Sequence, residues 1–328
     1  MGRELHDSGN HIAVLGAGSF GTAVAATLAR SGHAVDLYCR TAEQAELIQD
    51  TRENRRYFPG HKLQAQITAT NDLDRALAAN VIFLAFPARM MDDYAGKIAA
   101  GAPSDAIVVN LVKGLHEEAF TFAALFERVK PSVRYVSLKG PTFARPLFLG
   151  EWSGLTCGTS SEPARALVTD LFKDAPIVLD YSASAEAVDA VSAAKNVYAI
   201  VLGLAASVGL SENTTYLFVT LILKEISVIV RRLGFDPAVL LSFAGVGDTL
   251  LTGLCDTSRN RTLGVMMGRG IPIDSSRSDF LAEGARAVST LRRHLEGAET
   301  PLLDAVLAIL EHRAEPMSIL NVFEARNA

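Results

Sequence analysis

The feature that most constrains the fold is an apolar run that passes through three glycines into a helix. Residues 12–15 (IAVL) fit a fully buried strand, and from residue 20 onward Ala, Val and Leu recur at helical spacing. Between them, GAGSFG at residues 16–21 has the G-x-G-x-x-G spacing of a dinucleotide-binding turn.

Each glycine of this turn has a separate physical task. Gly16 permits the tight turn out of the strand, Gly18 lets the backbone approach a pyrophosphate, and Gly21 lets helix and strand pack closely. The helix N-terminus then offers free N–H groups and the positive end of its dipole to phosphates. An ordinary glycine-rich turn is the alternative, but the position between strand and helix favours a dinucleotide.

Composition excludes several classes of function. A length of 328 residues suggests two domains, and 49% hydrophobic with 20% charged residues describes a globular protein. The net charge of −5, without a basic block, argues against a nucleic-acid partner. Cys39, Cys157 and Cys255 are too few and too far apart for a disulfide framework, so we expect a reduced, cytoplasmic setting. The histidines show no metal-ligand spacing, so no metal is expected.

No segment reads as a signal or a membrane span. The N-terminus, MGRELHDSGNH, is polar. The longest uncharged apolar stretch, residues 196–211, is shorter than the roughly 20 residues that a span needs. We therefore predict a buried core helix there.

The first half of the chain alternates between strands and helices. Strands are expected at residues 34–39, 79–87, 106–111, 135–138, 154–157 and 177–179. Helices are expected at residues 41–50, 89–100, 117–129 and 162–172. This alternation predicts an α/β fold with a Rossmann-type, doubly wound parallel sheet.

The pattern changes at about residue 184, after which no convincing strand occurs. Helical stretches are expected at residues 184–208, 213–233, 236–243, after 260, and 301–311. We therefore predict a dinucleotide-binding domain over residues 1–183. An all-helical domain over residues 184–328 would then bind the substrate and catalyse its reaction.

The residue after the second strand bears on the choice of cofactor. A carboxylate there would bind the ribose 2′-hydroxyl of NAD, but the residue is Arg40, and Asp36 lies inside the strand. Because a guanidinium suits a 2′-phosphate, we favour NADP over NAD. A solvated arginine that starts a helix is the alternative.

Two further turns follow strands of the predicted sheet. Lys113-Gly114 can place an ammonium group in the ligand cleft at the carboxyl ends of the strands. In KGPTFA, at residues 139–144, Thr142 can cap the next helix and direct its hydroxyl inward. A loop without a ligand is the alternative for each.

The helical half contains a charged residue where an apolar one is expected. Lys195 and Asn196 interrupt the apolar helix AVSAAKNVYAI, and lysine is rarely buried without a partner. Lys195 is either a surface side chain that lies along apolar groups or a proton donor. For a donor, partial desolvation lowers the lysine pKa while a nearby carboxylate keeps the group charged. Asp248 is the candidate carboxylate, and a helix cap is its alternative role.

A cluster at residues 258–260 (Ser258, Arg259, Asn260) is the last group of candidate site residues. The arginine fork fits a phosphate or carboxylate bidentately. A dinucleotide, a lysine acid and an anion clamp together indicate reduction of a carbonyl in an anionic substrate.

Seven motifs together resemble one enzyme family. They are GAGSFGT (16–22), N-x-x-Y-x-P (54–59), KG (113–114), GPTFA (140–144), AKNVYAI (194–200), GVGD (245–248) and SRN (258–260). In this order and spacing the chain resembles the NAD(P)-dependent glycerol-3-phosphate dehydrogenases over about residues 12–310. The resemblance implies reversible reduction of dihydroxyacetone phosphate to sn-glycerol 3-phosphate, a phospholipid precursor. The apolar helices favour a homodimer.

The resemblance also implies roles for individual residues. Lys195 corresponds to the family's proton donor and acceptor. Substrate-site positions correspond to Lys113, Gly140, Thr142, Asn196, Asp248, Ser258, Arg259 and Asn260. Cofactor-site positions correspond to Gly16, Gly18, Ser19, Phe20, Gly21, Arg40, Lys113, Ala144, Arg259 and Glu283.

The chain departs from the family at several positions. Pro146 replaces the glutamate of GPTFA-x-E, Leu221 replaces the arginine of T-R-G, and Val112 replaces the first residue of S/T-K-G. Residues 209–213 keep only part of the usual glycine-rich entry to their helix. These changes leave open a related reductase that acts on another small phosphorylated or phosphonylated ketone. A non-catalytic redox sensor is a third hypothesis, which the presence of Lys195, Asp248 and Arg259 disfavours.

Overall fold

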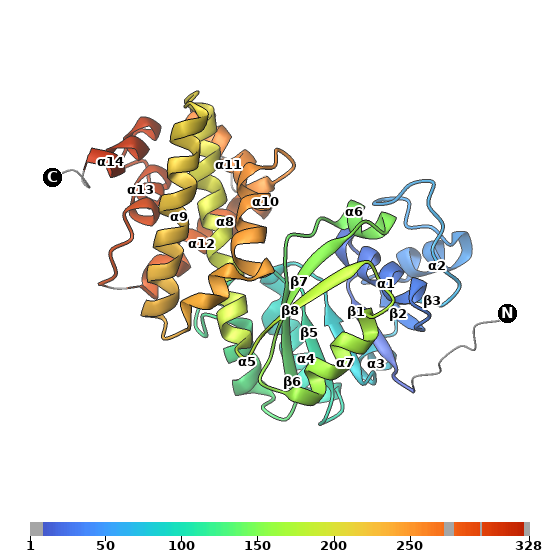
Figure 1. Ribbon diagram of the computed structural model, residues 1–328. Helices are drawn as coiled ribbons and strands as arrows, with labels where there is room; N and C mark the ends of the chain where they lie inside the picture. Colours follow the sequence, from blue (N-terminus) through green and yellow to red (C-terminus); the bar gives the residue numbers. More distant parts are fainter. Residues whose placement is uncertain (1–8, 272–278, 296, 325–328) are drawn as a thin grey trace. The chain divides into compact units, whose positions relative to one another are not determined.

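The computed structural model of the protein describes residues 9–271, 279–295 and 297–324, without the side chains of residues 279–285 (Figure 1). The chain divides into two compact units. The first contains residues 1–113 and 122–186, and the second contains residues 114–121 and 187–328. A short segment from the middle of the first unit's sequence therefore belongs to the second unit.

The first unit is built on one eight-stranded sheet. Its strands are β1 (Ile12–Leu15), β2 (Val35–Tyr38), β3 (Ile67–Thr70), β4 (Val81–Leu84), β5 (Ile107–Asn110), β6 (Arg134–Lys139), β7 (Ser153–Gly158) and β8 (Ile177–Ser182). Its helices are α1 (Ser19–Arg30), α2 (Ala42–Thr51), α3 (Leu73–Leu77), α4 (Met91–Gly101), α5 (Phe122–Val129), α6 (Ala144–Leu149) and α7 (Glu162–Phe172).

The strand order is β3-β2-β1-β4-β5-β6-β7-β8, so the order reverses between β1 and β4. This is the Rossmann order, extended by two strands, and it confirms the predicted fold class. The sheet is not wholly parallel, however, because β6 and β7 run antiparallel. Between them lies only α6, whose six residues rise about 9 Å, too short to carry the chain back across the sheet.

Two elements differ from the sequence prediction. The edge strand β3 was not predicted, because ITAT has only four residues and contains no continuous apolar run. The helix expected over residues 117–129 begins only at Phe122. Before it, His116 and Phe120 close a small antiparallel bridge, which a helical periodicity cannot show.

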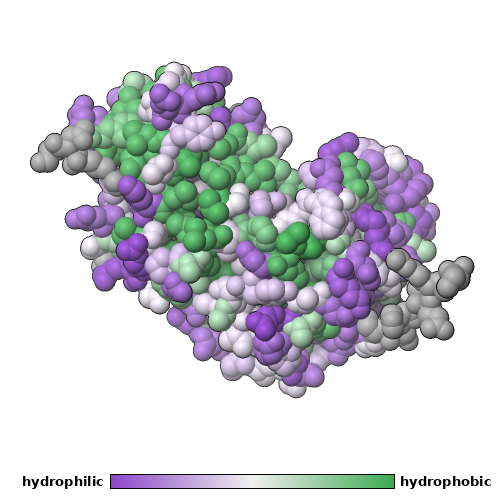
Figure 2. All heavy atoms as spheres, viewed as in Figure 1, coloured by the Kyte–Doolittle hydropathy of each residue, from purple (hydrophilic) through white to green (hydrophobic). Residues whose placement is uncertain are grey.

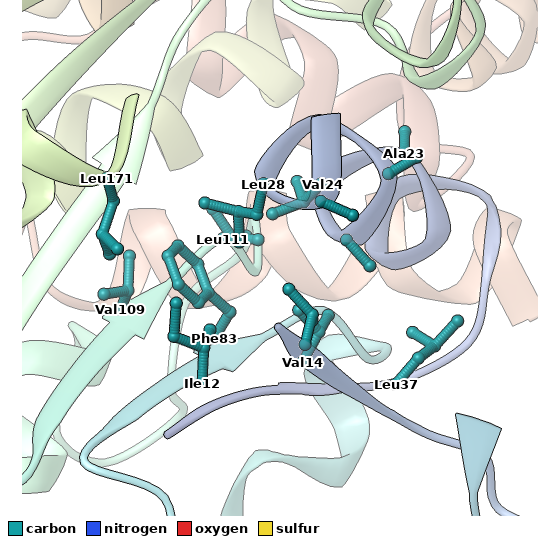
Figure 3. Packing of buried hydrophobic residues seen from close by; sticks show 14 of the residues in the cluster. Ile12, Val14, Ala23, Val24, Leu28, Leu37, Phe83, Val109, Leu111 and Leu171 are labelled. Carbon is teal, nitrogen blue, oxygen red and sulfur yellow. The ribbon is translucent and has the colours of Figure 1, made fainter. Parts of the chain in front are cut away.

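The core of the first unit explains why the glycine-rich turn follows β1. All four residues of β1, β2, β4 and β5 are buried, as expected for a parallel sheet covered on both faces. Figure 3 shows Val24 and Leu28 of α1 on the side of the helix near Val14 and Leu111, in the same buried cluster. This packing sets the direction in which α1 leaves the turn.

The second unit is helical in its described residues beyond 186. Its elements are α8 (Ala185–Ser207, which begins in the first unit), α9 (Glu212–Arg232), η2 (Pro237–Leu241), η3 (Phe243–Gly247), α10 (Asp248–Leu254), α11 (Arg259–Gly268), α12 (Asp279–Arg293), α13 (Pro301–Leu310), η4 (Pro316–Leu320) and α14 (Asn321–Glu324). The helix expected over 236–243 is a 3-10 turn, and a π-helical turn follows it.

One buried carboxylate ties three helices of this unit together. Glu225 of α9 accepts a hydrogen bond from the Tyr198 hydroxyl of α8 at 2.7 Å. It also accepts from the backbone N–H groups of Leu302 and Leu303, at 2.9 Å each, in the first turn of α13. Burial raises the pKa of Glu225, while these donors act in the opposite direction.

Two helices of this unit are long and apolar enough to cross a membrane by length and composition alone. In α8, 83% of the most apolar window is buried inside the protein, which is typical of a core helix. In α9 the corresponding share is 44%, and Lys224 and Glu225 interrupt its middle. Neither helix is therefore good evidence for a membrane span.

Candidate active site

The glycine-rich turn lies where the strand order reverses, between the carboxyl ends of β1 and β4. Gly16 has φ +119°, and a Cβ there would lie 2.6 Å from the Ala85 carbonyl oxygen, just after β4. A Cβ at Gly21 would lie 1.9 Å from the Gly16 carbonyl oxygen. A Cβ at Gly18 would meet nothing within 4 Å. Packing therefore requires two of the glycines, and the third borders open space, as a bound pyrophosphate requires.

The turn is held in place by side chains from neighbouring segments. The Ala17 carbonyl accepts hydrogen bonds from the side-chain amides of Gln44 and Asn54, both at 3.1 Å. Asn54 also donates to the Thr22 hydroxyl at 2.8 Å, and Asn54 is only 2% exposed. No role was predicted for Asn54, which the sequence shows only as the first residue of the N-x-x-Y-x-P motif. These bonds preorganise the turn.

The start of α1 suits an anion. The helix begins at Ser19, its N-cap Gly18 has no side chain to cap it, and its first turn contains no acid. Phe20 is half-buried and packs against the core. Because no side chain neutralises this helix end, its N–H groups and dipole are suited to bind phosphate. These residues fit a dinucleotide.

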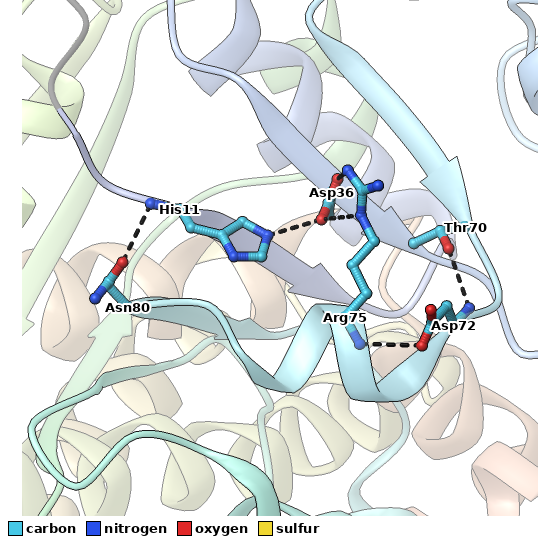
Figure 4. Close-up of polar contacts among 6 residues, drawn as sticks. All are labelled: His11, Asp36, Thr70, Asp72, Arg75 and Asn80. Carbon is cyan, nitrogen blue, oxygen red and sulfur yellow. Dashed lines mark hydrogen bonds and ion pairs between the residues drawn. The ribbon is translucent and has the colours of Figure 1, made fainter.

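The acid in β2 is committed to a structural role (Figure 4). The Asp36 carboxylate accepts hydrogen bonds from the Arg75 guanidinium, at 2.8 Å for each of two bonds, and from His11 at 2.8 Å. Burial acts to raise the Asp36 pKa, but Arg75 and His11 outweigh it, so the pKa is lowered. The exposed Arg40 is the charged residue that follows β2.

Two lysines lie at the carboxyl ends of β5 and β6. The Lys113 ammonium, after β5, donates to the Gly140 carbonyl, after β6, at 3.5 Å. The Lys139 ammonium, at the end of β6, donates to the Asn110 carbonyl, at the end of β5, at 2.6 Å. The Asn110 side chain accepts from the Val112 N–H at 2.8 Å and turns the chain there. Two lysine ammonium groups therefore lie at the carboxyl ends of these neighbouring strands. No role was predicted for Lys139 or Asn110.

The predicted capping role of Thr142 is wrong. The N-cap of α6 is Phe143, without a side-chain hydrogen bond, and Ala144 is the first helical residue. The Thr142 hydroxyl instead donates to the Gly154 carbonyl of β7 at 3.3 Å. A Cβ at Gly140 would lie 2.1 Å from that same carbonyl oxygen, so the turn packs directly on β7.

In the second unit, Lys195 of α8 forms a buried ion pair with Asp248, the first residue of α10. Each side chain is 1% exposed, so Lys195 is not a surface lysine. The Lys195 ammonium also donates to the Thr252 hydroxyl at 2.9 Å, and that hydroxyl donates to Asp248 at 3.2 Å. Thr252 lies one turn after Asp248, a helical spacing that could have revealed it. The π-helical turn before α10 is of a kind that is frequent at functional sites.

The cluster at residues 258–260 forms the start of α11. Ser258 is the N-cap, and its hydroxyl accepts from the Arg261 N–H at 3.4 Å. Arg259, the first helical residue, is exposed, and Asn260 is partly exposed. Within the described residues no hydrogen bond or ion pair involves the Arg259 side chain. A helix N-terminus with a guanidinium and no acid in its first turn is suited to bind a phosphate.

Close packing connects this helix to the one that carries Lys195. A Cβ at Gly203 of α8 would lie 2.1 Å from the Arg261 carbonyl oxygen, and a Cβ at Gly264 of α11 would lie 2.1 Å from the Ile200 carbonyl oxygen. The Arg261 guanidinium donates to the carbonyls of Leu202 at 3.2 Å and Gly253 at 3.0 Å. Lys195 and the start of α11 therefore belong to one closely packed part of the helical unit.

Two further predicted site residues remain predictions. Asn196 is partly exposed, next to Lys195 on α8. Glu283 lies in α12, and its side chain is not among the parts of the chain that the structure describes.

A hollow of about 460 Å³ in the first unit lies elsewhere. Its lining includes Arg134, at the start of β6, and Thr159 and Ser184, after β7 and β8. It therefore lies at the edge of the sheet opposite the glycine-rich turn, and it contains no predicted site residue.

The chain matches two family models that together cover most of its length. Residues 11–164 match the N-terminus, and residues 185–321 the C-terminus, of NAD-dependent glycerol-3-phosphate dehydrogenase.

Curated proteins and a solved structure are similar over nearly the whole chain. The glycerol-3-phosphate dehydrogenase (NAD(P)+) of Alcanivorax borkumensis is 31% identical over 98% of this chain and 94% of its own length. The protein of the same name from Methanothermobacter thermautotrophicus is 33% identical over 96% of this chain and 98% of its own. The crystal structure of glycerol-3-phosphate dehydrogenase from Coxiella burnetii has the same fold, with a TM-score of 0.87 at 22% identity over 96% of this chain and 98% of that chain.

The names of these curated relatives do not favour the alternative of a reductase for another small phosphorylated or phosphonylated ketone. The chain has a glycine-rich turn preformed where the strand order reverses, a buried lysine–carboxylate pair, and family matches on both halves. It therefore belongs to the NAD(P)-dependent glycerol-3-phosphate dehydrogenase family.

Proposed function

We propose that the protein reversibly reduces dihydroxyacetone phosphate to sn-glycerol 3-phosphate with NADH or NADPH. The observation that carries this proposal is the buried Lys195–Asp248 pair, on helices packed against the N-terminus of α11. A proton donor beside a phosphate clamp is what reduction of a phosphorylated ketone requires. The relatives from Alcanivorax borkumensis and Methanothermobacter thermautotrophicus, both named glycerol-3-phosphate dehydrogenase, support the same reaction.

The roles of the residues follow from their chemistry. The reduced nicotinamide supplies the hydride that C2 of the ketone accepts. Lys195 donates a proton to the developing alkoxide, and Asp248 and Thr252 hold its ammonium in one orientation. Arg259 and the start of α11 bind the phosphate. In the reverse direction Lys195 removes the proton from the C2 hydroxyl.

Stabilisation of the negative charge that develops on the carbonyl oxygen supplies much of the expected rate enhancement. The ammonium of Lys113 and the amide of Asn196 interact with the carbonyl end of the substrate in this proposal. A preorganised donor directed at a developing oxyanion contributes about 3–4 kcal/mol in a dry site. Removal of Lys113 should therefore lower kcat/KM strongly.

We also propose that NADPH is the preferred cofactor. The exposed Arg40 follows β2, where it can bind a 2′-phosphate. Asp36, the acid in β2, is already bound by Arg75 and His11, which supports this preference.

The direct test is oxidation of NADH and of NADPH, followed by absorbance, when dihydroxyacetone phosphate is added to the purified chain. The proposal expects turnover that depends on this substrate, and a product identified as the sn-3 enantiomer. No oxidation with either cofactor would reject the proposed reaction.

We further propose a homodimer that uses the exposed side of α9. Figure 2 shows hydrophobic side chains on the surface of the helical unit. On α9, Tyr216 is 60% exposed and Leu217 45%, and Leu241 in η2 is 83% exposed. Sedimentation equilibrium of wild-type protein and of Leu217→Lys would test this, because the charge should shift the mass toward the monomer.

We also propose that the protein acts in the cytoplasm, outside any membrane, where it would supply the phospholipid backbone. The three cysteines are free, and two of them are buried, as a reduced compartment allows. Fractionation of the source cells tests this placement.

A further inference from the structure

The segment of residues 114–121 bears on the position of Lys113, the lysine that is proposed to contact the substrate. It follows Lys113 directly, yet it packs in the helical unit. Phe120, 8% exposed, belongs to the buried core of that unit, and Leu115 packs against the same core. The chain re-enters the first unit at Phe122, where α5 begins.

The segment has a defined internal structure. His116 and Phe120 exchange backbone hydrogen bonds, with N–O distances of 3.0 and 3.1 Å. The His116 Nδ1 accepts from the N–H groups of Glu118 at 3.2 Å and Ala119 at 2.8 Å. The loop is thus closed by its own hydrogen bonds.

Phe120 holds an unusual backbone conformation. Its φ is +67°, a left-handed value that is rare for a bulky aromatic residue. Such a conformation persists only where the surroundings over-determine it, often at functional sites. Here the ring supplies that constraint, because it lies 4.9 Å, centroid to centroid, from the ring of His294 just after α12. The His294 Nδ1 is itself bonded to the Thr290 carbonyl at 2.9 Å.

Lys113 precedes this loop directly in the chain. Its ammonium contacts the Gly140 carbonyl in the first unit. Its backbone continues, through Gly114 with φ +153°, into the anchored loop. The loop that follows Lys113 in the chain is therefore packed in the core of the helical unit.

We propose that Phe120 is a positioning residue for substrate binding: its ring anchors the loop in the helical unit and thereby sets the place of the Lys113 ammonium. This inference rests on the proposed function, in which Lys113 contacts the substrate. The cofactor is held mainly by the turn at residues 16–21, so the anchor should affect substrate and cofactor unequally.

The test compares Phe120→Ala with a matched variant, Phe218→Ala. Phe218 is also a buried ring of the helical unit, fully buried and 4.7 Å from the Phe323 ring, but its segment does not lead to Lys113. Phe120→Ala should raise KM for dihydroxyacetone phosphate about tenfold to a hundredfold, since loss of one charge-assisted contact to a substrate has an effect of that size. The Kd for NADH, measured by fluorescence, should change less than about threefold, because the glycine-rich turn is intact. Phe218→Ala should lower Tm and leave both constants unchanged.

Two more variants separate the effect of the Phe120 ring from the effect of its backbone conformation. Phe120→Gly tolerates the positive φ but lacks the ring, so it should show the same high KM as Phe120→Ala. Phe120→Leu keeps an apolar anchor and should restore part of the affinity. If Phe120→Gly instead binds the substrate normally, the ring is not the anchor and the proposal is wrong.

Hydrogen exchange of residues 112–121 gives a readout that does not depend on activity. Exchange should accelerate in Phe120→Ala and not in Phe218→Ala. An unchanged KM together with unchanged exchange in Phe120→Ala would overturn the proposal. If the wild-type protein did not reduce dihydroxyacetone phosphate at all, the proposed function would fail, and the exchange experiment would still decide whether Phe120 anchors the loop.

Discussion

Lys195 of α8 and Asp248 of α10 form an ion pair in which each side chain is 1% exposed. Removing one member of a buried pair leaves the other charge uncompensated, which costs about 3–5 kcal/mol. A variant that lacks only the lysine therefore tests stability and catalysis together. Replacing both members by apolar residues of similar size separates the two effects.

Lys195→Met should lower kcat by about a hundredfold to ten-thousandfold, because it removes the proton donor. It should also lower Tm, while NADPH still binds. In Lys195→Met/Asp248→Leu, Tm should recover and turnover should not. Steady-state kinetics, cofactor fluorescence and thermal unfolding measure these effects, and recovery of turnover in the double variant would contradict the role of Lys195.

Thr252→Val should lower kcat about tenfold, which corresponds to one lost hydrogen bond of typical strength. The valine keeps the shape of threonine but cannot accept from Lys195 or donate to Asp248. Thr252→Ser keeps the hydroxyl and should retain kcat near that of the wild type. An equal loss of kcat in both variants would show that the packing of the side chain, and not its hydroxyl, sets kcat.

Arg259→Ala should raise KM for dihydroxyacetone phosphate by about ten to a hundredfold, since a charge-assisted contact to phosphate contributes about 1.5–3 kcal/mol. Turnover of unphosphorylated dihydroxyacetone should change little. Arg269→Ala, in an exposed arginine at the other end of α11, is the matched control. A similar rise in KM in both variants would indicate a general charge effect.

Arg40→Ser should weaken NADPH binding about tenfold or more and leave NADH binding nearly unchanged, because the guanidinium would contact only the 2′-phosphate. Titration of cofactor fluorescence with both nucleotides measures the ratio of the two Kd values. A constant ratio would remove the basis for an NADPH preference.

Asp36→Asn should lower the free energy of unfolding at about pH 7 by about 1–3 kcal/mol, because the Arg75 and His11 contacts lose their charged acceptor. Since the Asp36 pKa is lower in the folded state than its ordinary value of 3.8, this contribution is present above that value. It is lost as the pH falls through the lowered pKa.

The stability difference between wild type and Asp36→Asn should therefore shrink as the pH falls below about 4. Urea unfolding at several pH values measures it. A difference that stays constant with pH would show that the carboxylate charge does not contribute.

The fold and family could be predicted because their signals are local. Turn geometry requires the glycines at residues 16–21, and the alternation of apolar strands with helices is visible in the chain itself. The contacts that hold these parts were not predictable in the same way. Asn54, which fixes the turn, and Thr252, which binds Lys195, are polar residues whose partners lie on other elements.

The sequence by itself determined that a dinucleotide site, a sheet of the Rossmann type and a lysine on an apolar helix occur in one chain, because each depends on the periodicity or spacing of neighbouring residues. Only the tertiary structure decided that Lys195 is buried against Asp248, that Asp36 is committed to Arg75, and that the loop after Lys113 packs in the helical unit. These facts depend on which surfaces meet when the chain folds, and residues far apart in sequence carry no local sign of that meeting.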